Sequence, residues 1–141
     1  MRPRILPLLL ALSVVVALTG CFGGEASSEP HKLILEEAPT TGKVGDIIVV
    51  KYRVEGPSAT AQYNFLRYDT ESHPYKVGVR AEDYRSFTFQ PGKQTMVPVP
   101  ANFSVALKLE KPGPLYYRVN VGIPPQDLWS EEIRINVTAA S

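Results

Sequence analysis

The segment Glu132-Ile-Arg-Ile-Asn-Val-Thr138 alternates polar and apolar side chains at every position. In an extended strand successive side chains point to opposite faces, so Ile133, Ile135 and Val137 share one face. One-sided alternation is typical of an antiparallel sheet that packs one face on a core and leaves the other in water. The segment therefore predicts one strand of a layered β-structure.

Three further segments show the same alternation: residues 46–54, 102–109 and 115–121. Their core-facing residues are predicted to be Ile48, Val50, Tyr52, Val54, Phe103, Val105, Leu107, Leu109, Leu115, Tyr117, Val119 and Val121. In the last segment we expect Tyr116, Arg118 and Asn120 to point outward into solvent.

Shorter alternations fill the gaps between these strands. They lie at Leu33 and Leu35, at residues 61–68 with Tyr63 and Phe65 on one face, at residues 75–79, and at Phe87 and Phe89. The chain also has 13 Pro and 10 Gly, which favour turns over long helices. We predict an all-β domain of seven or eight strands and exclude a helical bundle.

Residues 109–119, Leu-Glu-Lys-Pro-Gly-Pro-Leu-Tyr-Tyr-Arg-Val, resemble a corner found in fibronectin type III and immunoglobulin-like domains. There a Pro/Gly turn precedes a Tyr whose hydroxyl bonds back to the corner. The spacing here is one residue longer, so Tyr116 and Tyr117 both remain candidates, and alternation favours Tyr117. The resemblance implies an immunoglobulin-like antiparallel β-sandwich.

The first 20 residues have the features of a signal peptide. Arg2 and Arg4 precede an uncharged run, residues 5–17, rich in Leu and Val. A helix of that length reaches about 20 Å, short of the roughly 30 Å hydrocarbon core of a bilayer. A basic start, a short apolar run and small residues before a cleavage site predict removal of this segment.

Residues Leu18-Thr19-Gly20-Cys21 resemble the lipobox of bacterial lipoproteins. The resemblance implies cleavage between Gly20 and Cys21, diacylglycerol on the Cys21 thiol, and a fatty acyl group such as palmitate on the new amino group. The alternatives are an ordinary signal peptide and a membrane span that contains a cysteine by chance.

The lipobox interpretation divides the chain into a cleaved lipoprotein signal peptide (1–20), a lipidated, flexible tether (21–30) and a sandwich domain (31–141). It places the domain in the cell envelope, lipid-anchored to the membrane on the extracytoplasmic face. By resemblance to enterobacterial sorting rules, Phe22 in place of Asp implies the outer membrane of a Gram-negative cell.

Charge argues against a nucleic-acid partner. Removal of Arg2 and Arg4 from the 15 basic residues leaves 13 against 14 acidic ones. Such a balance provides no strong positive field to attract a phosphate backbone.

The residues that could carry chemistry are few. Cys21 is consumed by lipidation, and no nucleophile motif accompanies either of the two His. Asp69, Glu71 and His73 alternate, so on a strand they would share one face and could transfer a proton or bind a metal. The competing interpretation, which we favour, is a polar, solvated turn. We therefore expect no enzyme activity and no cofactor.

Three residues are candidates for ligand binding: Trp129, Tyr68 and His73. Trp129 is the only Trp, in the connection before the last strand, where it either anchors an interface or plugs the open end of the sandwich. Exposed aromatic side chains would suit an envelope protein or a glycan as partner.

The chain also shares features with chagasin-like inhibitors of cysteine peptidases, which are immunoglobulin-like domains. Val44-Gly45-Asp46 matches the start of their second strand. The loop that follows, residues 56–60, matches their inhibitory loop only at Pro57, and residues 125–129 are a distant match to a second element. The resemblance implies inhibition of secreted cysteine peptidases as an alternative function, and a metal-binding module is a third.

The leading hypothesis is a non-catalytic, membrane-anchored lipoprotein whose domain binds or scaffolds another envelope component. Replacement of Cys21 by Ser tests the anchor, because it removes the thiol that would carry the lipid. We expect membrane fractionation and gel mobility to show release of the protein or accumulation of its precursor. A Cys21→Ser protein that is processed and membrane-bound like the natural chain would contradict lipidation.

Overall fold

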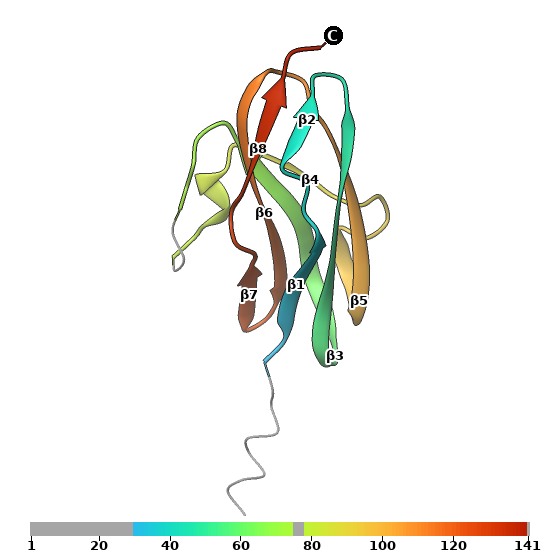
Figure 1. Cartoon of the computed structure of the whole chain (residues 1–141). Helices are drawn as coiled ribbons and strands as arrows, with labels where there is room; N and C mark the ends of the chain where they lie inside the picture. Colours follow the sequence, from blue (N-terminus) through green and yellow to red (C-terminus); the bar gives the residue numbers. More distant parts are fainter. Residues whose placement is uncertain (1–29, 75–77, 141) are drawn as a thin grey trace, which may run out of the picture.

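The computed structural model describes residues 30–74 and 78–140. Eight strands account for most of this part of the chain (Figure 1). They are β1 (Lys32–Glu37), β2 (Thr41–Lys43), β3 (Ile47–Asp69), β4 (Ser86–Thr88), β5 (Thr95–Lys108), β6 (Gly113–Ile123), β7 (Gln126–Trp129) and β8 (Ile133–Thr138). The predicted all-β sandwich of seven or eight strands is confirmed.

The strands form two layers joined by β3 and β5. The first layer pairs β1 and the second half of β5 with the first half of β3. The second layer has the order β4–β3–β6–β8–β2, and β7 also pairs with β6.

Strands β3 and β5 cross between the layers at one corner. Their register moves from Val54 opposite Ala101 to Ala59 opposite Val99, so four residues of β3 face one of β5. Gly56 at this corner has φ of 136°, a conformation that L side chains rarely adopt. A Cβ atom there would also lie 2.7 Å from the ring of His31. Glycine is therefore needed at the corner.

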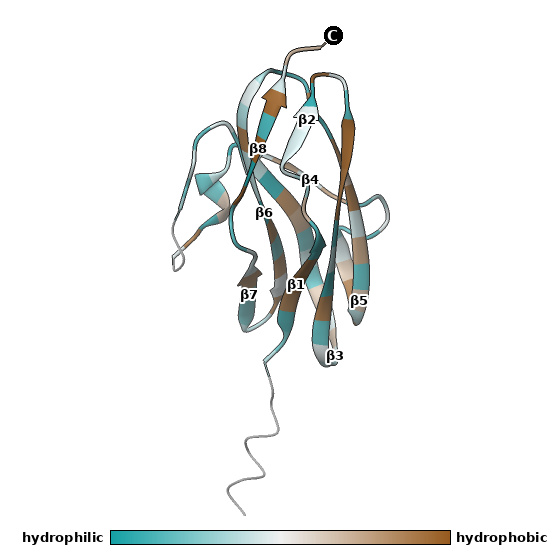
Figure 2. Ribbon diagram, viewed as in Figure 1, coloured by the Kyte–Doolittle hydropathy of each residue, from teal (hydrophilic) through white to brown (hydrophobic). Residues whose placement is uncertain are grey.

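The core lies between the layers and contains the residues that alternation predicted. Val50, Tyr52, Val105 and Val119 are fully buried, and Tyr52 stacks on Phe103 with ring centroids 5.1 Å apart. Figure 2 shows apolar and polar residues alternating along these strands. Because burial of apolar area drives folding, this shared interior is what holds the two layers together.

The corner tyrosine is Tyr117, as alternation favoured, but its bond differs from the one implied by the resemblance. Tyr117 is buried, and its hydroxyl donates to the backbone oxygen of Pro39 at 3.1 Å. Pro39 lies between β1 and β2, where the chain leaves the first layer for the second. The bond therefore fixes that crossing instead of closing the Pro/Gly turn.

Two further details correct the prediction. The sandwich is not wholly antiparallel, because β2 pairs with β8 in parallel, with Gly42 opposite Val137. A strand at 75–79 is not found in the described residues: 78–80 are irregular, and Ala81–Asp83 is a 3₁₀ turn. Residues 75–77 lie outside the described part of the chain.

The predicted signal peptide, Cys21, and the tether up to residue 29 also lie outside the described residues. Within the described part, no helix is long and apolar enough to cross a membrane. The first described residues are fastened to the domain, because the backbone N–H of His31 donates to Gln126 Oε1 at 2.9 Å. The chain therefore enters the sandwich beside β7.

Val119→Asp tests the inward face of β6. Val119 is 0% exposed, so an aspartate there would be a buried, unpaired charge, and we expect a loss of more than about 3 kcal/mol of unfolding free energy. Ile47→Asp is the matched control, because Ile47 is 66% exposed. Urea unfolding measures both variants, and equal stabilities would contradict the assigned core.

Candidate functional site

The outer face of the second layer carries a cluster of aromatic side chains around one arginine. On β3 this face follows from alternation, because Asn64 and Leu66 are buried on the other side. Strand register places Phe87 of β4 opposite Arg67 and Trp129 of β7 opposite Asn120. Both side chains therefore lie on this same face. We call the set the aromatic–arginine face: Tyr63, Phe65, Arg67, Phe87, Phe89 and Trp129.

Arg67 lies at the centre of this face. Its guanidinium carbon is 5.1 Å from the ring centroid of Phe65, 5.8 Å from that of Phe87 and 5.9 Å from that of Trp129. A cation over a ring face is attracted by the ring quadrupole, so the arginine and the aromatic rings hold one another in place. Phe87 is nevertheless 55% exposed, so part of the cluster is open to solvent.

The charge of Arg67 is only partly satisfied. Its Nε donates to Asn120 Oδ1 at 2.9 Å, but within the described residues no carboxylate forms an ion pair with it. Burial lowers the pKa of Arg67, against smaller raising effects of Tyr63 and Asp127. A partly desolvated cation with spare N–H donors is suited to binding a carboxylate from another molecule.

Asp127 organises the polar edge of the face. Its carboxylate accepts bonds from the Tyr63 hydroxyl at 2.5 Å, from Asn120 Nδ2 at 2.8 Å and from Trp129 Nε1 at 3.0 Å. Burial and then this carboxylate raise the pKa of Tyr63 to about 12. Gly122 makes room for the Tyr63 ring, which a Cβ atom at that position would overlap. These polar groups therefore satisfy one another.

Arg118 and Asn120 were expected to be solvated, and both are buried. Asn120 lies beneath Arg67 and β7, and Arg118 is 4% exposed. The reason is residues 70–74 and 78–85, here called the cover segment, which fold over the upper part of the outer face. Arg118 donates from Nη2 to the His73 oxygen at 2.8 Å and from Nε to the Tyr84 hydroxyl at 2.7 Å.

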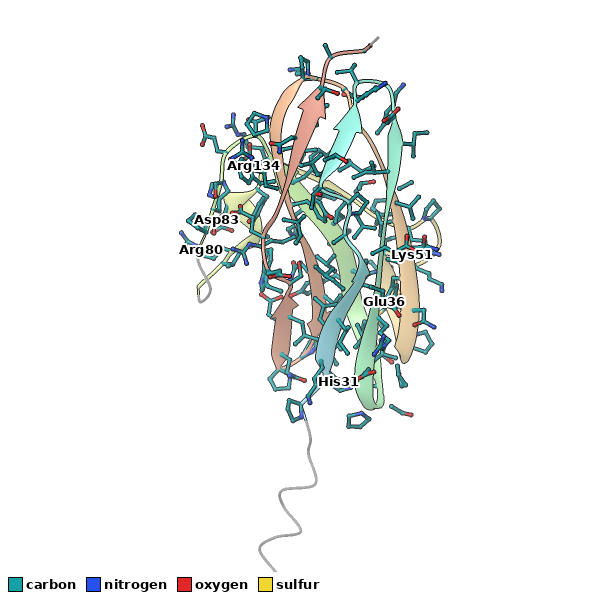
Figure 3. The ribbon with its side chains drawn as sticks, in the orientation of Figure 1. His31, Glu36, Lys51, Arg80, Asp83 and Arg134 are labelled. Atoms are coloured by element: carbon teal, nitrogen blue, oxygen red, sulfur yellow. The ribbon has the colours of Figure 1, made fainter. Side chains whose placement is uncertain are left out.

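Glu132 fastens the cover segment to the sheet. Its carboxylate accepts bonds from Ser72 Oγ at 2.7 Å, from the His73 N–H at 2.7 Å and from the Tyr84 hydroxyl at 3.0 Å. Figure 3 shows the outer end of the cover segment, with Arg80 and Asp83, projecting from the flank of the sandwich. The backbone of His73 thus helps to hold the cover segment in place.

The structure brings together two of the three residues predicted to bind a ligand. The Tyr84 ring contacts His73, with centroids 4.9 Å apart, and Trp129, with centroids 6.3 Å apart. Trp129 belongs to β7 on the outer face and does not plug the end of the sandwich. Tyr68 lies apart from them, on the core-facing side of β3.

The acidic cluster around His73 is more buried than the turn interpretation implied. Asp69 is 6% exposed, and its carboxylate lies 3.6 Å from His73 Nε2. Burial raises its pKa, but bonds from Thr70 and Arg85 outweigh this and hold the pKa below its ordinary value. Arg85 also pairs with Glu71 at 3.2 Å. Among the described residues no three His, Cys, Asp or Glu are placed to hold a metal ion.

The segments around Pro57 and Gln126, which resemble chagasin-like inhibitors, meet at His31, whose Nδ1 contacts Gln126 Oε1 at 3.1 Å. Pro57 is at the corner, where its backbone oxygen contacts His31 Nε2 at 2.7 Å, whereas residues 126–129 form β7 on the outer face. No family model matches the chain, and no curated protein matches its sequence. The site itself must therefore carry the functional argument.

Glu132→Ala tests the fastening of the cover segment. Loss of the shared acceptor should cost about 1–3 kcal/mol and speed amide hydrogen exchange in residues 70–85 more than in the strands. The neighbouring exposed residue gives the control Glu131→Ala. If both variants exchange alike in this segment, Glu132 does not hold it.

Proposed function

We propose that this protein is a non-enzymatic bacterial lipoprotein, held on the extracytoplasmic side of a membrane by lipid on Cys21. Its sandwich domain binds another envelope protein through the aromatic–arginine face. The observation that carries the binding proposal is Arg67, a half-buried cation set among three aromatic rings with no ion-pair partner in the described residues. Trp, Tyr and Arg dominate the binding energy of protein interfaces.

The chemistry of the face favours a protein over a glycan. A sugar ring stacked on an aromatic side chain also needs hydrogen-bond partners around it. Here the polar edge is occupied internally, because Asp127 takes the donors of Tyr63, Asn120 and Trp129. What remains open is apolar ring surface, chiefly Phe87, and the guanidinium of Arg67. That combination suits an apolar segment that carries a carboxylate.

The position of the tether supports action close to the membrane. His31, at the end of the tether, bonds to Gln126, the residue beside Asp127 on the polar edge of the face. As a flexible coil, the nine residues 22–30 that follow Cys21 would span on the order of 15–18 Å, so the face would remain near the bilayer. The arrangement suits a partner that is itself at the membrane surface. The inhibitor alternative is supported only by the contact of both Pro57 and Gln126 with His31, and the described residues place no three metal ligands together.

The proposed binding of an envelope protein by the aromatic–arginine face is tested with variants of the anchored protein. In-cell crosslinking and mass spectrometry should recover one envelope protein with the natural chain. Arg67→Ala and Phe87→Ala should each reduce its recovery, since truncation of an interface hot spot costs about 2 kcal/mol or more. Arg53→Ala, on the first layer, is the matched control, because Arg53 forms exposed ion pairs with Glu36 and Glu55.

Circular dichroism should show that all three variants are folded. Unchanged recovery with Arg67→Ala and Phe87→Ala would reject the face as the binding surface. Recovery that depends on a co-purifying polysaccharide, and is lost after its enzymatic digestion, would assign the face to a glycan instead.

A further inference from the structure

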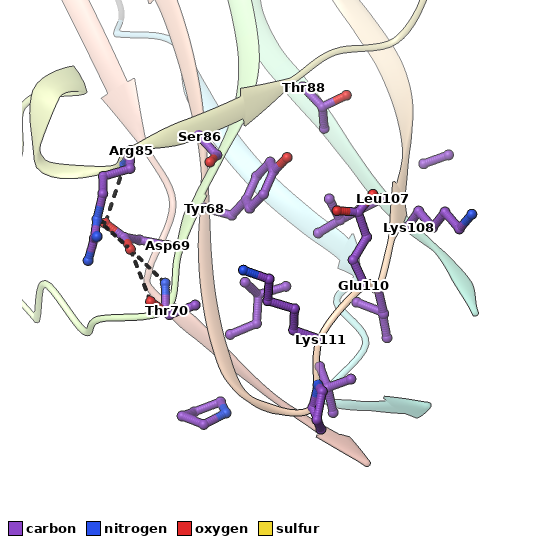
Figure 4. Close-up of a pocket in the computed structure, with 16 residues that line it drawn as sticks. Tyr68, Asp69, Thr70, Arg85, Ser86, Thr88, Leu107, Lys108, Glu110 and Lys111 are labelled. Atoms are coloured by element: carbon purple, nitrogen blue, oxygen red, sulfur yellow. Dashed lines mark hydrogen bonds and ion pairs between the residues drawn. The ribbon is translucent and has the colours of Figure 1, made fainter. Parts of the chain in front are cut away.

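His31 joins the start of the domain to two other elements at one end of the sandwich. Figure 3 shows its place, where the chain enters β1. Its ring lies against Gly56 at the corner of β3, and its contacts with Pro57 and Gln126 are here called the His31 clasp. The cavity that Tyr68 lines, beside the turn from β5 to β6, is at the opposite end (Figure 1 and Figure 4).

Both ring nitrogens of His31 face carbonyl oxygens. Nε2 lies 2.7 Å from the backbone oxygen of Pro57, and Nδ1 lies 3.1 Å from Gln126 Oε1. A carbonyl oxygen only accepts hydrogen bonds, so each contact requires a proton on the ring nitrogen. A neutral imidazole carries one N–H, and only the imidazolium carries two. The neutral ring therefore makes one of these bonds and sets a lone pair against the other oxygen.

The Gln126 side chain does not remove this conflict by turning over. Its Oε1 also accepts the backbone N–H of His31 at 2.9 Å, and its Nε2 faces the His31 backbone oxygen at 3.5 Å. Exchange of the two amide atoms would set an NH₂ group against that N–H and lose the bond. The backbone of His31 thus fixes the orientation of the amide, so the ring has to supply the second proton.

No ion pair competes with these oxygens for the ring. Within the described residues no carboxylate forms an ion pair with His31. The charged residues next to the clasp along the three elements are Lys32 on β1, Glu55 on β3 and Asp127 on β7. Glu55 pairs with Arg53, and Asp127 accepts three bonds on the polar edge of the aromatic–arginine face. The two carbonyl oxygens therefore favour the protonated ring.

We propose that the His31 clasp is a pH-sensitive fastening of the start of the domain to β3 and β7. Both ring bonds form when the imidazole is protonated, and one is lost when it is neutral. Histidine changes its charge between about pH 5 and 8, so the clasp tightens on acidification within that range. Because the folded domain favours the protonated ring, this stability is present at low pH and lost as the pH rises. The proposal does not rest on the proposed function.

Thermal unfolding of the full-length protein in detergent at about pH 5.5 and about pH 8 tests the clasp. His31→Phe keeps an aromatic ring but removes both nitrogens. The natural chain should exceed this variant in Tm by a margin that is about 4 °C or more larger at the lower pH. Comparison of variants at each pH cancels the titration of all other groups. An equal margin at both pH values would overturn the proposal.

Gln126→Leu separates the clasp from titration of an isolated histidine. With Pro57 as the one remaining acceptor, a neutral ring protonated on Nε2 satisfies the site, so the pH-dependent margin over His31→Phe in the same background should disappear. Gln62→Leu is the matched control, because Gln62 is exposed on β3 and should leave the margin intact. A margin that survives in the Gln126→Leu protein would contradict the clasp, as would nitrogen-15 NMR at the lower pH showing one protonated ring nitrogen on His31.

Discussion

The turn of β3 from one layer to the other is the constraint on which the rest of the structure depends. Its first half pairs with β1 and β5, and its second half pairs with β4 and β6. Because β5 turns at the same level, backbone pairing continues around the corner. Gly56 permits that turn, and the His31 ring rests against it. Backbone pairing and the contact of His31 with Gly56 thus connect the start of the domain, the corner and both layers.

The outer face of the second layer is divided by the cover segment. On one part of the face, the backbone of the cover segment and its Tyr84 side chain bury Arg118. Glu132 holds the cover segment in this position. On the other part, the Phe87 ring beside Arg67 remains 55% exposed. A buried arginine that is fully engaged stabilises structure, whereas a half-buried one with spare donors is available for recognition. On this face Arg118 therefore serves the structure, and Arg67 is the arginine proposed to bind a partner.

The short pair of β3 and β4 separates two environments. Phe87 and Arg67 face outward to the proposed protein partner, and Tyr68 faces inward toward the core. Because β4 has only three residues, the Phe87 ring is left exposed at the edge of the outer face.

The sequence by itself determined the longer strands and which of their apolar side chains enter the core, because a period of two is a local property of the chain. It did not predict the short strands β2 and β7. It also identified Trp129 and His73 as candidates for a site. The alternation of Tyr63, Phe65 and Arg67 on one strand was a further signal that could have pointed to the same face. Tertiary structure alone decided that Trp129 meets Arg67, that Arg118 and Asn120 are buried, and that Tyr68 lines a cavity. Those outcomes depend on cross-strand register and on a distant segment folding over the sheet. Neither is encoded in the local alternation that made the strands predictable.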